Sequence, residues 1–109
     1  MTIAEAIDGF EQRWVADQAF TPRTAYDRTL RLLAFWLESD GRSVFDELVT
    51  LVPEDLDAFV RWHAVNALAD DADGSRKIAL HVARLGSYLS TACDRPDLDV
   101  GRARLRAQV

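Results

Sequence analysis

Apolar residues recur at steps of three and four positions along most of the chain, and this spacing places them on one face of a helix. No segment alternates apolar and polar residues as a strand would. The pattern therefore predicts an all-α protein with four main helices. The first begins after Thr2, the second covers residues 22–38, the third begins at Pro53, and the fourth runs from about Ser75 toward Pro96.

Residue types at the expected helix starts support these boundaries. Thr2 followed by Glu5 is the capping-box pattern, in which each side chain accepts a hydrogen bond from the other residue's backbone N–H. Thr21 followed by Pro22 predicts a capped helix with proline at its first position, where no backbone N–H is needed. Pro53 is followed by acidic residues, which the helix dipole favours in a first turn.

Three segments lie outside the four predicted helices. Residues 42–52 hold spaced apolar side chains and form either one short helical turn or an apolar loop. Residues 70–74 are predicted to be an acidic loop. Residues 97–109 hold three arginines and form either a short helix or a linker. The helical domain is therefore expected to span residues 1–96.

The four helices are expected to pack as a compact orthogonal or splayed bundle, because no heptad repeat persists long enough for a coiled coil. Cys93 is expected to be a small core residue, and His63 a partly buried histidine on the apolar face of the third helix. The side chains expected to form the main core are Ile7, Phe10, Trp14, Tyr26, Leu30, Leu33, Leu37, Leu56, Phe59, Val60, Ile78, Val82, Leu85 and Leu89.

Composition narrows the class of protein. The 109 residues suffice for one domain, and 49% of them are hydrophobic, which is ordinary for a globular fold. The longest apolar run, residues 32–37, is too short to cross a membrane, and the chain start lacks a signal-peptide pattern, so we expect a cytoplasmic protein. The single cysteine excludes an internal disulfide. Asp outnumbers Glu and Arg outnumbers Lys, which fits either a GC-rich genome or a high-salt cytoplasm.

The formal net charge of −5 is distributed unevenly along the chain. The first and third expected helices are acidic, whereas the second and fourth are basic. On a helical wheel, the basic and hydroxyl residues of the second and fourth helices lie away from the apolar stripes, as phosphate contacts and major-groove readout require. The candidate DNA-binding residues are Arg23, Thr24, Arg28, Arg31, Arg76, Lys77, His81, Arg84, Ser87 and Tyr88.

For one basic helix face taken alone, a solvated surface is the better explanation. Two such helices, with the acids segregated to the other two, favour a binding function. On this interpretation Arg28 and Arg84 lie on one shared positive patch, and the opposite surface is acidic.

The chain shows no residue pattern for catalysis or for a cofactor. It lacks a glycine-rich phosphate loop, a nucleophile elbow and a His-Glu-x-x-His metal motif. Tyr26 lies in an apolar stripe, and Tyr88 has no cluster of basic partners around it. We therefore expect no catalytic residue, metal, cofactor or small-molecule substrate in this chain.

Three segments, taken together, are similar to one known family. TPRTAYDRTLRLLAFWLES resembles the second helix of the N-terminal core-binding domain of tyrosine recombinases, the phage integrases. LVPEDLDAFV resembles the start of that family's third helix, and SRKIALHVARLGSYLSTA its last main helix. The resemblance covers about residues 2–96 and depends on the order, lengths and charge alternation of the pieces.

The resemblance implies a SAM-like four-helix fold that clamps duplex DNA through its second and fourth helices. It further implies contacts with neighbouring recombinase protomers through the first and outer helices. Residues 97–109 would begin the linker to a catalytic domain, and strand exchange during DNA integration would belong to that longer protein. The alternative is a helical protein-interaction module whose basic helix docks an acidic partner. A small helical enzyme is a third possibility, with no residues that support it.

Overall fold

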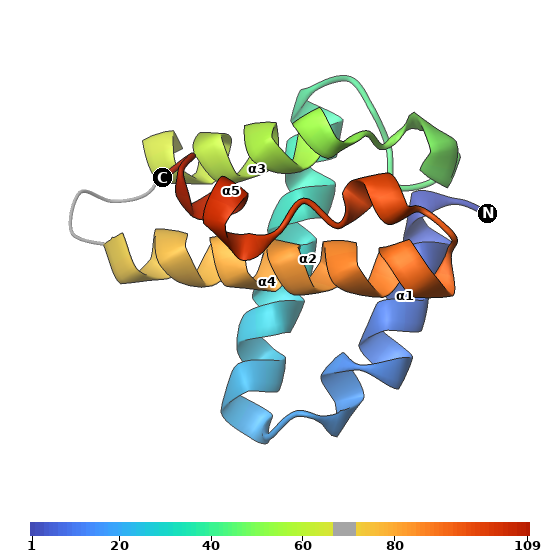
Figure 1. Cartoon of the computed structure of the whole chain (residues 1–109), viewed down its shortest axis with the longest axis horizontal. Coiled ribbons are helices and arrows are strands. Elements are labelled where there is room, and N and C mark those ends of the chain that lie inside the picture. The colour runs from blue at the N-terminus through green and yellow to red at the C-terminus, as the bar shows by residue number, and fades with distance from the viewer. Residues whose placement is uncertain (67–71) are drawn as a thin grey trace. The chain divides into compact units, whose positions relative to one another are not determined.

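The computed structural model describes residues 1–66 and 72–109, and its main elements in these ranges are helices joined by turns and loops (Figure 1). No strand occurs in the described ranges, where β pairing is limited to an isolated antiparallel bridge between Thr2 and Glu47. The predicted all-α class is therefore confirmed. The helical elements are α1 (Ile3–Arg13), η1 (Val15–Asp17), α2 (Phe20–Ser39), η2 (Leu48–Thr50), α3 (Pro53–Asn66), α4 (Ala72–Ala92), η3 (Pro96–Leu98) and α5 (Arg102–Arg106).

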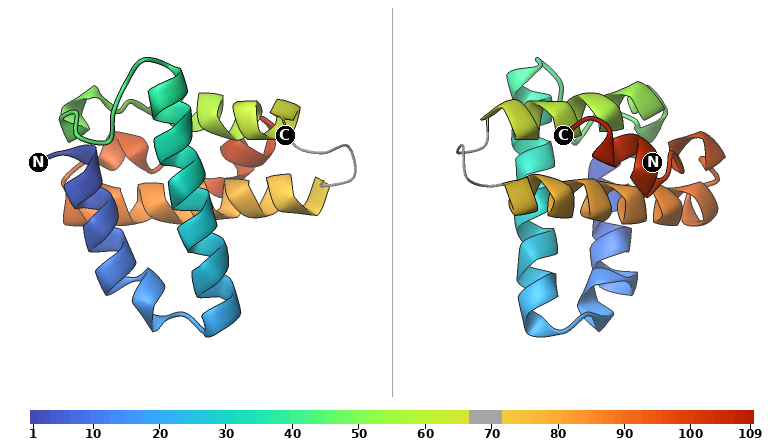
Figure 2. Two further views of the ribbon diagram at one scale, coloured as in Figure 1. Left: turned by 180° about the vertical axis from the view of Figure 1, so that it is seen from behind. Right: turned by 60° about the vertical axis from the view of Figure 1, so that its left-hand side comes forward.

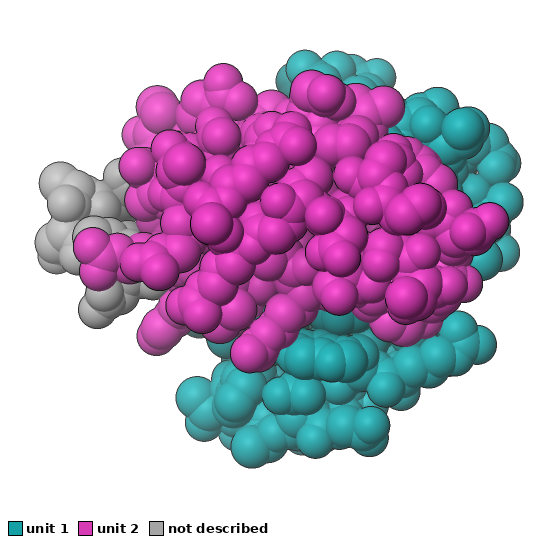
Figure 3. Space-filling view, viewed as in Figure 1, with its two compact units in different colours: residues 1–51 teal, residues 52–109 magenta. Residues whose placement is uncertain are grey.

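The chain divides into two compact units (Figure 3). Unit 1 is Met1–Leu51 and holds α1 and α2, which form a helical hairpin joined through η1 (Figure 2). Unit 2 is Val52–Val109 and holds α3, α4 and α5, with α4 packed against both of the others. The expected single domain over residues 1–96 stays a prediction. Residues 97–109 contain the end of η3 and all of α5 within unit 2, so the short helix, one of the two forms considered for this segment, is present. The role of the segment as a linker stays a prediction.

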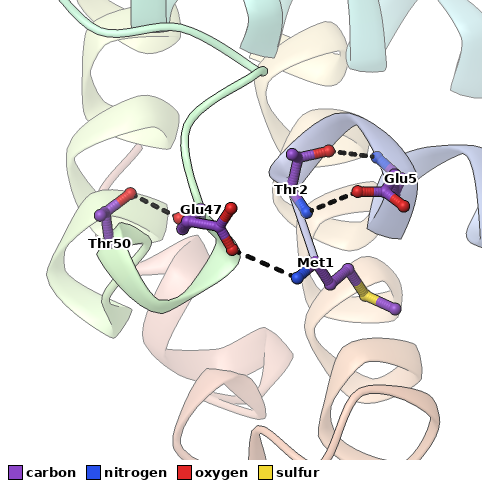
Figure 4. A network of polar contacts seen from close by, with 5 residues as sticks. All are labelled: Met1, Thr2, Glu5, Glu47 and Thr50. Carbon is purple, nitrogen blue, oxygen red and sulfur yellow. Dashed lines mark hydrogen bonds and ion pairs between the residues drawn. The ribbon is translucent and has the colours of Figure 1, made fainter.

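The start of α1 is closed by the predicted capping box (Figure 4). The Glu5 backbone N–H donates to the Thr2 hydroxyl at 3.1 Å, and the Thr2 backbone N–H donates to the Glu5 carboxylate at 3.0 Å. The hydrogen bond from the Thr2 backbone is the main reason why the pKa of Glu5 is lowered. Two of the backbone donors that every helix start leaves without an intrahelical partner are thereby satisfied.

The segment 42–52 is a loop that ends in the 3₁₀ turn η2, so both elements considered for it are present. It runs back along the start of α1. The Ile3 N–H donates to the Asp46 carbonyl at 2.9 Å, and the Leu48 N–H donates to the Met1 carbonyl at 2.8 Å. The Met1 amino group also lies 3.2 Å from the Glu47 carboxylate (Figure 4). The loop thus supplies acceptors that α1 itself cannot provide.

The second helix begins earlier than the sequence predicts. Its first residue is Phe20 and its cap is Ala19, which makes no side-chain hydrogen bond, so the predicted cap at Thr21 is wrong. Pro22 stands at the third helical position instead of the first. The helix tolerates it there because none of the first-turn N–H groups has an intrahelical acceptor, so proline removes no hydrogen bond.

α2 ends at Ser39, one residue after the predicted end of the second helix. Gly41 has a φ of 73°, which a residue without Cβ adopts at little cost. Its N–H donates to the Glu38 carbonyl at 3.0 Å, and the Arg42 N–H donates to the Leu37 carbonyl at 2.8 Å. These two bonds make up a Schellman motif, which ends the helix with its last carbonyls satisfied.

Three aromatic side chains pack together in unit 1. The ring of Phe10 stacks on Trp14 with centroids 5.3 Å apart, and Tyr26 contacts both rings edge-on. Trp14 is half-buried, whereas the sequence predicts it in the core. It stands at the C-cap of α1, where the chain leaves the helix and turns into η1. Every other residue of the predicted main core is buried.

Unit 2 buries residues that the apolar stripes did not reveal. Leu98 in η3 and Leu105 in α5 are fully buried. A Cβ on Gly86 would overlap the Leu98 carbonyl oxygen, so the absence of a side chain there lets η3 lie directly on α4. Cys93, which was expected inward, is half-exposed because α4 ends one residue before it.

The fourth helix also begins earlier than predicted. It starts at Ala72, so Asp73 and Gly74 belong to α4 and not to an acidic loop. Residues 70 and 71 of the predicted loop lie outside the described residues. Across the described ranges, no helix combines the length and apolar character needed to cross a membrane.

Candidate nucleic-acid interface

The exposed face of α4 carries cationic and hydroxyl side chains. Counting about 100° per residue, these residues occupy the side opposite the buried stripe Ile78–Val82–Leu85–Leu89. From residue 75 to residue 92 the helix contains no acidic residue. The exposed polar residues of this face are Arg76, Lys77, Arg84, Ser87 and Thr91. Tyr88 is half-buried at its edge.

A similar face lies on α2. Thr24, Arg28 and Arg31 are exposed and follow one another at helical steps of four and three residues. Phe35, four residues beyond Arg31, continues the same stripe and is 59% exposed. Sequence reasoning placed no function on Phe35. Phe35 lies on the helix face opposite Tyr26, and this spacing could have identified it from the sequence as an exposed member of the same stripe.

The N-terminal end of α2 adds a further exposed cation. The guanidinium of Arg23 lies over the ring of Phe20, 5.8 Å from its centroid. Phe20 is 73% exposed, so this cation–π contact is at the surface. Arg23 is itself exposed.

His81 differs from its expected role. Its side chain is buried, with 7% of the residue exposed, because it lies at the edge of the apolar stripe of α4. Burial is the main reason why the pKa of His81 is lowered to about 4, and the positive charges of Arg84 and Lys77 contribute to the same shift. The imidazole is therefore neutral at physiological pH and cannot serve as a cationic phosphate contact. We remove His81 from the candidate interface.

The remaining histidine and Tyr26 pack inside the units and do not belong to the basic faces. His63 is half-buried, as predicted, and its Nδ1 lies 3.4 Å from the Ser75 hydroxyl. Tyr26 is buried in the aromatic cluster of unit 1. Within residues 1–66 and 72–109, no three His, Cys, Asp or Glu side chains come together as metal ligands.

Two arginines near the C-terminus form ion pairs within unit 2. The Arg104 guanidinium donates to both carboxylate oxygens of Asp57. Arg95 donates to Asp97 through two nitrogens, at 2.9 and 3.0 Å. Arg102 and Arg106 are exposed. The C-terminal arginines are thus divided between structural pairs and open surface.

The structure brings the candidate residues together in two sets. Nine of the ten predicted residues, all except His81, are exposed or half-buried on α2 in unit 1 or on α4 in unit 2. The shared patch expected for Arg28 and Arg84 spans the two units and stays a prediction.

No protein-family model, curated protein or solved structure matched this chain. The candidate interface is therefore defined by its own geometry and charge.

Proposed function

We propose that this chain binds duplex DNA through the exposed faces of α2 and α4. The observation that carries the proposal is the face of α4, where Arg76, Lys77 and Arg84 are exposed beside two hydroxyl residues and where residues 75–92 include no acid. Cationic and hydroxyl side chains on one helix face are the groups that contact phosphate oxygens. The major groove is wide enough, at about 12 Å, to admit a helix.

We further propose that this binding is that of a tyrosine recombinase core-binding domain with a SAM-like bundle. The support is the resemblance of α2, the start of α3 and α4 to that family's helices, together with the all-α fold. In that role the chain is the DNA-clamping part, and strand exchange belongs to a separate catalytic domain.

The charge count sets the expected strength of binding. Six cations of the candidate set remain after His81 is removed, three on α2 and three on α4. Each neutralised phosphate contributes about −0.9 to the slope of log K against log salt, so four or five contacts give a slope of about −4. Since the net charge is −5, binding should fall in the non-specific range of roughly 10⁻⁴ to 10⁻⁶ M.

A titration of fluorescently labelled duplex DNA at several salt concentrations tests the proposal. Lys77→Ala and Arg84→Ala should each weaken binding and reduce the salt slope by about one. The matched controls are Arg13→Ala on α1 and Arg61→Ala on α3, which remove the same charge from the acidic helices and should leave the slope unchanged.

Two outcomes would overturn the proposal. Equal effects from all four substitutions would show that only total charge matters and that the basic faces have no special role. Absence of binding at low salt would favour the alternative function, in which the basic face of α4 docks an acidic protein partner.

A further inference from the structure

A small groove lies between α1 and α2 within unit 1. Its volume is about 210 Å³. Its apolar floor is formed by Ala4, Ile7, Leu30, Ala34 and Val44. Pockets for cofactors and drug-sized ligands measure about 300–1,000 Å³, so this groove suits one side chain better than a small-molecule cofactor.

The rim of the groove carries an excess of negative charge. Asp8 and Glu11 line it from α1, and Arg31 lines it from α2. Asp8 and Glu11 are three residues apart on one helix face, where like charges destabilise each other. In the described parts of the chain, neither carboxylate has a cationic partner within 4.0 Å. The rim therefore presents two acids that nothing in unit 1 pairs with directly.

The titration of Glu11 reflects these surroundings. Burial raises the pKa of Glu11, and the nearby charges of Asp27 and Asp8 raise it further. Arg31 acts in the opposite direction, as the smallest of the four effects. A second cation placed in the groove would relieve the repulsion that Arg31 leaves in place.

We propose that this groove binds an arginine side chain from a partner protein. The apolar stem of an arginine can cover the floor while its planar guanidinium meets the two carboxylates. Arginine fits better than lysine because its fork of donors can engage two acceptors at once. The same carboxylates repel phosphate. The groove therefore does not bind DNA, which is the partner proposed for the basic faces of α2 and α4.

Arg31 stands at the border between the groove and the basic face of α2, and it separates the two functions. Its positive charge should favour DNA and disfavour a second cation in the groove. Arg31→Gln is therefore expected to weaken DNA binding and to strengthen arginine binding by about threefold, within the energy range of exposed ion pairs. A variant that simply damaged the fold would weaken both.

The experiment is an NMR titration of the isotope-labelled chain with the blocked peptide Ala-Arg-Ala. We expect saturable shifts, in the millimolar range, confined to the floor residues Ile7, Ala34 and Val44. The same peptide with neutral citrulline in place of arginine should bind at least about threefold more weakly. The pKa of Glu11, followed through its side-chain carbon signal, should fall when the arginine peptide binds.

Isosteric substitutions provide the matched comparison. Glu11→Gln and Asp8→Asn should each reduce affinity for the arginine peptide by about threefold, whereas Glu38→Gln, an exposed acid of α2 outside the groove, should not. Equal binding of the arginine and citrulline peptides, or shifts that persist unchanged in Glu11→Gln, would overturn the proposal. So would the absence of saturable shifts. None of these results bears on the DNA titration, so the two proposals fail separately.

Discussion

Arg104 in α5 donates hydrogen bonds to the carboxylate of Asp57 in α3 through two nitrogens. Its Nε lies 3.0 and 3.1 Å from the two carboxylate oxygens, and its Nη2 lies 2.6 Å from one of them. Asp57 is buried and Arg104 is exposed. The hydrogen bonds to Asp57 raise the pKa of Arg104. The two residues lie 47 positions apart in the chain, so this pair joins the C-terminal helix α5 to α3 within unit 2.

We expect Arg104→Gln to lower the thermal midpoint of unfolding, because it leaves the Asp57 carboxylate buried without its cation. The control is Arg106→Gln, which removes the same charge from an exposed residue of the same helix and should change the midpoint little. Thermal unfolding followed by circular dichroism measures both. If the two variants unfold at the same temperature, the pair does not stabilise the docking of α5.

Gly86→Ala is expected to destabilise the protein by about 1–3 kcal/mol, because the added methyl group must displace the Leu98 carbonyl. The sign is informative, since glycine to alanine in an ordinary helix interior stabilises by about 1 kcal/mol. Ser87→Ala, at the exposed neighbouring position, is the control and should change the free energy of unfolding by no more than about 0.5 kcal/mol. A stabilised Gly86→Ala variant would contradict the close packing of η3 on α4.

Leu33→Ala and Leu85→Ala should each cost about 2–5 kcal/mol in urea unfolding, since both side chains are buried and each truncation leaves a cavity. Val65→Ala, at a position 78% exposed, should cost no more than about 0.5 kcal/mol. Losses below half a kilocalorie at both leucines would mean that the wrong helix faces are assigned to the core.

The lowered pKa of His81 predicts a pH dependence of stability. Between about pH 6.5 and pH 4 the unfolded chain binds a proton at His81 that the folded chain excludes, so acidification across this window favours unfolding. His81→Gln removes this contribution. We therefore expect the stability of the variant to fall less steeply than that of the natural chain over the same window, as measured by urea unfolding at several pH values. Parallel curves would show that His81 titrates normally.

The four helices and their inward faces could be predicted from the sequence because both depend on local periodicity. Residues three and four apart meet on one side of a helix whatever surrounds it, so the stripes of α2, α3 and α4 identified Tyr26, Phe59 and Val82 as core residues. The capping box of Thr2 and Glu5 was predictable for the same reason, since its partners lie three residues apart.

Only the tertiary structure decided features that depend on distant segments. The sequence gives Leu98 and Leu105 no periodic pattern, and they are buried because α4 and α3 lie against η3 and α5. His81 stands at the edge of a stripe, where the spacing is compatible with either side, and its surroundings made it a neutral core residue. The fold of unit 1 likewise places Glu11 of α1 beside Arg31 of α2 in the groove and within the electrostatic influence of Asp27. No local spacing along the sequence predicts which two helices come together in this way. Periodicity determines which face of a helix is apolar, whereas the neighbours of that face are set by how the chain folds back on itself.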